Sequence, residues 1–139
     1  MNRENVLREV LKAANTSIDS IKALESVNTD EQFSVALLEQ ERSYQDLEIK
    51  VKNIITNEKI GVKDEGFMPK VMLWGTTKVK TLVDNSPSKL AEMLIQGANM
   101  GVISLTKVEN ALEPGVDRSL LDELSAKYHN TVDTMKAYL

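Results

Sequence analysis

The sequence predicts an all-α protein, an antiparallel four-helix bundle with an additional C-terminal helix. Apolar residues recur every three or four positions in five segments, the spacing that places them on one face of an α-helix. No segment alternates as a strand does, and aromatic residues make up only 4% of a chain that is 42% apolar. Most segments are joined by short turns, as between neighbouring helices that run in opposite directions. With 139 residues and no dividing linker, we expect one domain over residues 1–139.

The first two helices are predicted over residues 3–27 and 29–57. The second contains no Gly or Pro, and we expect Thr29 to cap it, with Gln32 completing a capping box. Each has one apolar stripe, although two polar residues lie in the second. The stripes are Leu7, Val10, Leu11, Ala14, Ile18 and Ile21 in the first helix, and Phe33, Leu37, Gln40, Tyr44, Leu47, Val51 and Ile55 in the second.

Three further helices are predicted after a long connection that contains two glycines and a proline. The third covers residues 67–83. Ser86 caps the fourth, over residues 87–112, with Pro87 at its first position, and Asp117 caps the fifth. The last two stripes are Ala91, Leu94, Ile95, Ala98, Val102, Leu105 and Leu112 in the fourth helix, and Leu121, Leu124, Tyr128, Val132 and Met135 in the fifth.

Composition excludes several classes of function. The chain has no cysteine, so it has neither disulfides nor a thiolate metal site. A net charge of −4 argues against non-specific binding to nucleic acid. No apolar run is long enough to span a bilayer, and the first residues do not form a signal peptide, so we expect a cytoplasmic protein without membrane contact. Phosphate-binding loops and nucleophile motifs are also missing from the sequence.

Short motifs in the third and fourth predicted helices are similar to those of a known family. They are Trp74-Gly75, Lys78-Val79-Lys80, Leu90-Ala91-Glu92, Gly97 and Glu109-Asn110-Ala111-Leu112. In these motifs the chain resembles the uncharacterised bacterial domain-of-unknown-function family numbered 2383, which belongs to the ferritin-like superfamily. Glu41 and Tyr44 fall where that family has an acid followed by an aromatic residue. The resemblance implies a ferritin-like bundle, and a di-iron site if the ligands are present.

The ligands of a di-iron site are scarce here. Such a site needs carboxylates from two helices and Glu-x-x-His pairs from two others, and this sequence has no Glu-x-x-His. Its one histidine, His129, is interpreted as a surface residue, and Glu41 and Glu48 as solvated carboxylates beside the stripe. Glu25 lies near a helix end, where it can reach water. We therefore expect no cofactor; the remaining candidates for iron or manganese are Glu41, Tyr44, Glu48, Glu92 and Glu109.

Several apolar residues fall outside the predicted stripes, where either the fifth helix or another subunit must cover them. These interface candidates are Trp74, Val35, Leu38, Ile49, Met93, Met100 and Ile103. We expect a non-enzymatic protein that acts through protein contacts, as a homodimer or other homo-oligomer. One alternative is a divergent metal-binding protein that handles iron or oxidants. Another is a module that holds a small apolar ligand between helices lined by Met68, Met72, Met93 and Met100.

Overall fold

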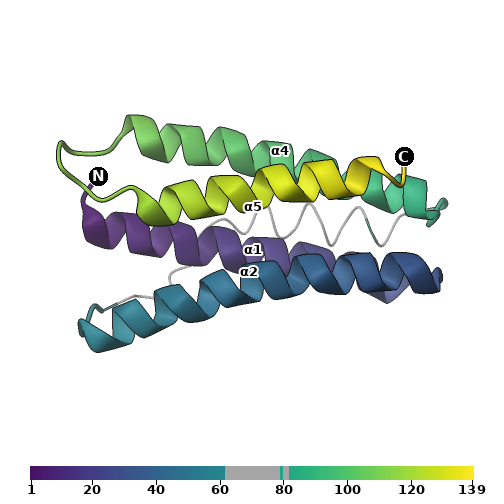
Figure 1. Ribbon diagram of the computed structural model, residues 1–139, viewed down its shortest axis with the longest axis horizontal. Helices are drawn as coiled ribbons and strands as arrows, with labels where there is room; N and C mark the ends of the chain where they lie inside the picture. Colours follow the sequence, from purple (N-terminus) through teal and green to yellow (C-terminus); the bar gives the residue numbers. More distant parts are fainter. Residues whose placement is uncertain (62–78, 80–81) are drawn as a thin grey trace.

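The computed structural model describes residues 1–61, 79 and 82–139, and this part of the chain contains four α-helices and no strand (Figure 1). The prediction of an all-α bundle is confirmed for these residues. Among them, no helix combines the length and the apolar character that crossing a bilayer requires. The third predicted helix falls largely outside the described residues. The helices are α1 (Arg3–Val27), α2 (Glu31–Asn57), α4 (Pro87–Asn110) and α5 (Ser119–Lys136).

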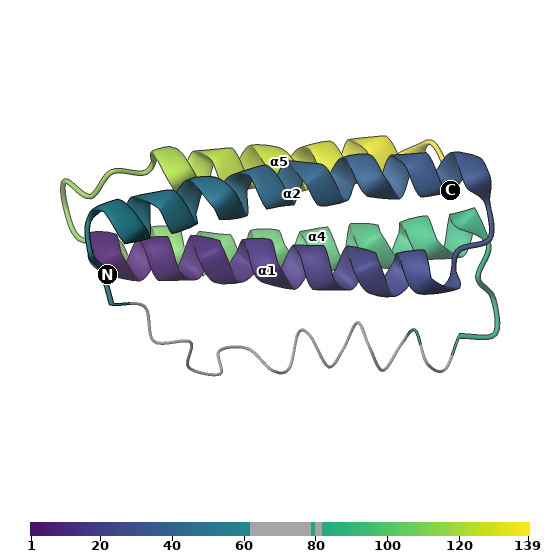
Figure 2. The same ribbon diagram turned by 90° about the horizontal axis from the view of Figure 1, so that it is seen from below.

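The four helices lie side by side along the long axis of the molecule, as two perpendicular views show (Figures 1 and 2). The closest packing is between α1 and α2 and between α4 and α5. The start of α1 lies beside the ends of α2 and α4. Arg3 Nη1 contacts Glu58 Oε2 at 2.6 Å, and the N-terminal amine donates to the Ala111 carbonyl at 2.7 Å. Near the other end, Asn85 Nδ2 donates to the Val27 carbonyl at 2.9 Å.

Side-chain caps show why α1 and α2 begin where they do. Asn2 and Asn5 satisfy each other's backbone N–H groups at the start of α1. The expected cap of α2 at Thr29 is wrong by one residue, because Asp30 accepts the hydrogen bond from the Phe33 N–H at 2.8 Å. A carboxylate also interacts favourably with the positive end of the helix dipole, which a hydroxyl cannot do to the same extent.

The starts of α4 and α5 also differ in how well their caps agree with the prediction. The prediction for α4 is confirmed: Ser86 is the cap and Pro87 is the first helical residue. In α5 the predicted cap is displaced, because the helix begins at Ser119 with Arg118 in the capping position and no side-chain cap. Asp117 still contributes, since its Oδ1 accepts a hydrogen bond from the Ser119 N–H at 2.9 Å.

The core lies between the inner faces of the helices, and the predicted stripe of α2 is buried at all seven positions. In α4 the buried face is turned from the predicted one. Met93, expected on the back of this helix, is only 5% exposed, whereas Ile95 is only partly buried. In α5 Thr131 is fully buried, whereas the neighbouring Val132, predicted to lie in the stripe, is only partly buried. Polar partners across the bundle, described next, explain the burial of Thr131.

Candidate functional site

A chain of hydrogen bonds connects α2 and α5 in the middle of the bundle. We call it the polar centre, and it consists of Gln40, Tyr44, Asn130 and Thr131. The Tyr44 hydroxyl lies 2.7 Å from Thr131 Oγ1, which donates to Gln40 Oε1 at 2.6 Å. Gln40 Nε2 in turn donates to Asn130 Oδ1 at 3.3 Å. Because Gln40, Tyr44 and Thr131 are at most 4% exposed, these bonds replace the water that the groups have lost.

A second tyrosine, Tyr128 of α5, lies beside the polar centre with its ring centroid 6.0 Å from that of Tyr44. Its hydroxyl is hydrogen-bonded to Ser17 of α1, but burial dominates and raises its pKa to about 12. Burial likewise raises the pKa of Tyr44. Gly101 of α4 leaves room for this ring, because a Cβ there would overlap Tyr128. Both tyrosines are therefore neutral hydrogen-bonding groups at physiological pH, not bases.

A pocket of about 100 Å³ opens between α1 and α4. Its walls come from small residues of the two helices, among them Ala13 and Ser20 of α1 and Gly97 of α4. The buried residues Tyr44, Tyr128 and Thr131 also line it, so the pocket reaches the polar centre. The space exists because small side chains cannot fill the distance between the two helices.

Two carboxyl groups, Glu25 of α1 and Glu41 of α2, form what we call the acid pair. The Oε1 atom of each is buried and receives no hydrogen bond from a donor group among the described residues. Glu41 Oε2 accepts one from Gln45 Nε2 at 3.1 Å. Burial, followed by the hydrogen bond and charge of Glu41, raises the pKa of Glu25 to about 7, although Lys22 acts in the opposite direction. Near neutral pH, Glu25 is therefore partly protonated.

The expectation that Glu25 and Glu41 are carboxylates in water is wrong for the buried atoms of this pair. The spacing along one helix does not show which residue of the neighbouring helix lies opposite. A signal was present, because Glu25 continues the spacing of Ile18 and Ile21 and so lies on the inward face of its helix. Glu41 follows the buried Gln40 directly, which turns it towards the other neighbour of α2.

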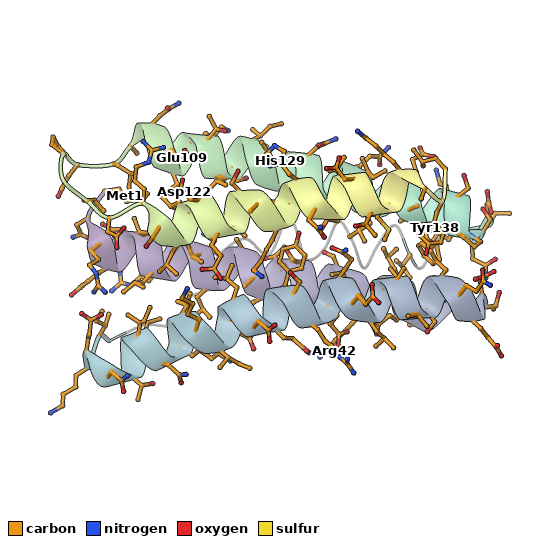
Figure 3. All side chains as sticks on the ribbon, viewed as in Figure 1. Met1, Arg42, Glu109, Asp122, His129 and Tyr138 are labelled. Atoms are coloured by element: carbon orange, nitrogen blue, oxygen red, sulfur yellow. The ribbon has the colours of Figure 1, made fainter. Side chains whose placement is uncertain are left out.

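The structure does not gather the five metal candidates, which were Glu41, Tyr44, Glu48, Glu92 and Glu109. Tyr44 belongs to the polar centre, while Glu41 faces α1. The other three each pair with a nearby lysine or arginine. In the described part of the chain, no group of three or more His, Asp or Glu side chains is placed to hold a metal ion. His129 and Glu109 are on different helices, and the exposed His129 has Nδ1 2.7 Å from the Ser125 carbonyl oxygen (Figure 3).

The interface candidates divide into three groups. Val35, Leu38 and Ile49 are 57%, 44% and 55% exposed, and we call them the outer row of α2. Arg42, which lies between them in the sequence, points away from the bundle (Figure 3). Met100 and Ile103 are exposed on α4, whereas Met93 belongs to the core and is removed from the candidates. Trp74 lies outside the described residues.

Comparison with known proteins finds no matching family model, and neither a curated protein nor a solved structure matches the chain. The coarser part of the resemblance, a small all-helical bundle, is shown by the structure. Membership of the ferritin-like superfamily has no support from these comparisons.

Proposed function

We propose that this protein is a non-enzymatic antiparallel bundle of the ferritin-like type that acts through protein contacts, first of all with a second copy of itself. The observation that carries the proposal is the outer row of α2, where three large apolar side chains are about half exposed. Their positions differ by three and eleven residues, about one and three helical turns, so they lie along one side of α2. Apolar side chains in such a row gain most when a partner buries them.

The polar centre supports the non-enzymatic part of the proposal. It lies mid-bundle, where a di-iron site of a ferritin-like protein would be found. Its side chains are neutral and bonded to one another, and both tyrosines are held in their protonated forms by burial. A general base or nucleophile needs a lone pair free to react near neutral pH. These groups serve to fix the packing of α2 on α5.

Sedimentation equilibrium of the full chain tests the association. We expect the wild type to form dimers, and Leu38→Glu or Ile49→Glu to give monomers of unchanged helix content, because a charge in an apolar interface prevents its burial. Thr106→Glu is the control, since it introduces the same charge at an exposed residue of α4 that is not among the interface candidates. A wild type that is monomeric at its highest soluble concentration would overturn the proposal, as would dimers that survive both α2 substitutions.

The alternative of an iron- or manganese-binding bundle has less support, because the described acidic side chains are not gathered around one point. Elemental analysis of protein purified with iron, manganese and zinc, then desalted, separates the two readings. About two metal ions per chain, as in di-iron bundles, would replace our proposal with the metal-binding one. A content below about a tenth of an ion per chain would support the proposal, since a folded site of this type retains its metal.

A second candidate function, the holding of a small apolar molecule, is favoured by the pocket between α1 and α4. Cavities of about 150 Å³ bind benzene, so the volume of about 100 Å³ suits at most a single ring. Hydroxyl groups such as that of Ser17 would pair with a polar substituent on that ring. Titration with phenol should shift the amide signals of Gly97 and Gly101 saturably, and Gly97→Leu should abolish the shifts by filling the pocket. Shifts that do not saturate would dismiss this function.

A further inference from the structure

The two carboxyl groups of the acid pair are placed so that a hydrogen bond between them requires a proton. Helical side chains lean towards the N-terminus of their own helix. Because the start of α1 lies beside the end of α2, Glu25 and Glu41 lean towards each other across the contact between these helices. Their two Oε1 atoms are buried there without a donor from any described side chain or backbone group. Two adjacent acceptor oxygens can form a hydrogen bond only if one of them carries a proton.

The charged groups around the pair do not supply a substitute for that proton. Among the described residues, those acting on Glu25 are Glu41 from α2 and Lys22 from α1 itself, while α4 and α5 supply none. Lys22 is exposed and weakens the repulsion without removing it. Further along the same contact, the exposed Asp19 is acted on by Lys22 of its own helix and, more weakly, by Glu48 of α2. Gln45 donates to the other oxygen of Glu41 and leaves its Oε1 unpaired.

We propose that Glu25 and Glu41 share a single proton between α1 and α2, and that loss of this proton near neutral pH weakens the packing of the two helices. With the proton in place, the pair is one hydrogen bond of the strong, charge-assisted type. Without it, two negative charges lie side by side, partly removed from water. The α1–α2 contact is thus a pH-responsive element, independent of whether the protein associates through the outer row.

The direction of the effect follows from the difference between the folded and the unfolded chain. The pKa of Glu25 is about 7 in the folded protein, against 4.5 for a carboxyl of this type in water. Between these values the folded state binds a proton that the unfolded state has released. The stabilisation is therefore complete below about pH 4.5 and is lost as the pH rises through about 7.

Urea unfolding of the full chain at pH 5 and pH 8, with a chelator present, tests the proposal. Because the pair is only partly buried and solvent screens its charges, we expect the folding equilibrium constant to be roughly tenfold larger at pH 5, well below the unscreened limit. Glu41→Gln should remove most of this difference and should make the protein more stable than the wild type at pH 8. Glu39→Gln is the matched control, the same change on the exposed side of α2, and should behave as the wild type does.

A second measurement reads the proton directly. The side-chain carboxyl ¹³C signal of Glu25 should show a titration step near neutral pH, where the proton that it shares with Glu41 is lost. In Glu41→Gln the signal of Glu25 should titrate at a lower pH, since its like-charged neighbour is gone. The proposal fails if Glu25 titrates only in the acid range, or if Glu41→Gln and Glu39→Gln give the same pH dependence.

Discussion

Adjacent residues of α2, Gln40 and Glu41, are buried to different degrees and face different neighbours. Gln40 points to α5 and belongs to the polar centre, in which the buried side chains are hydrogen-bonded to one another and no member carries a charge. Glu41 points to α1, where it interacts with another carboxyl, that of Glu25. The polar centre therefore keeps its hydrogen bonds at any pH near neutrality, whereas the acid pair keeps its bond only while a proton is present.

The difference teaches how a single helix can hold one neighbour firmly and another conditionally. A neutral network stabilises by satisfying buried groups, so its contribution changes only when a side chain is removed. The contribution of the acid pair to stability changes with the pH of the solvent as well. The changes in unfolding free energy caused by substitutions in the two regions should therefore differ more clearly in their pH dependence than in their magnitude.

Loss of the central hydroxyl of the polar centre should have the largest effect. Thr131→Val keeps the shape of a fully buried residue but leaves the Tyr44 hydroxyl and Gln40 Oε1 without their shared partner. We expect the free energy of unfolding to fall by about 2–3 kcal/mol, equally at pH 5 and pH 8, as measured by urea unfolding. Thr134→Val, one turn further along α5 and only partly buried, should change it by less than about 0.5 kcal/mol. A pH-dependent loss in Thr131→Val would contradict the contrast between the two regions.

Two glycines of α4 test the packing around the polar centre with a smaller effect. Gly101→Ala should destabilise by about 1–2 kcal/mol, because the new Cβ overlaps the Tyr128 ring and forces it to move. Gly97→Ala meets no described atom and should instead stabilise by about 0.5–1 kcal/mol through the better helix propensity of alanine. Thermal unfolding of the two variants gives both signs in one experiment. If both variants are stabilised, the position of Tyr128 is not fixed by Gly101.

The part of the fold that could be predicted is the part that depends on local periodicity. The stripe of α2 was found in full, including the polar members Gln40 and Tyr44, because their spacing alone places them on the buried face. The rotation of α4 could not be predicted, because Met93 and Ile95 are both apolar and the neighbouring helices decide which of them is buried. The cap of α2 could not be predicted because Thr29 and Asp30 are both good capping residues. The sequence does not show at which of the two the helical backbone begins.

The candidate sites were less predictable than the helices, for a different reason. Thr131 is polar, and its burial depends on Gln40 and Tyr44, which are 91 and 87 positions away in the sequence. The acid pair likewise requires two residues that face each other only after α1 and α2 have packed. Spacing along one helix reveals a face, but it does not reveal what the opposite helix presents to that face.

The smallest predicted effect concerns the lysine beside the acid pair. Lys22→Gln removes a positive charge that lowers the pKa of Glu25, so the carboxyl step near pH 7 should move upward by a few tenths of a pH unit. Side-chain ¹³C titration measures the shift, and Lys50→Gln is the control, because Lys50 pairs with Glu123 of α5 at 2.9 Å. A downward shift in Lys22→Gln would mean that Lys22 does not act on Glu25 as an attractive charge. The raised pKa would then need a cause other than the balance between burial, Glu41 and Lys22.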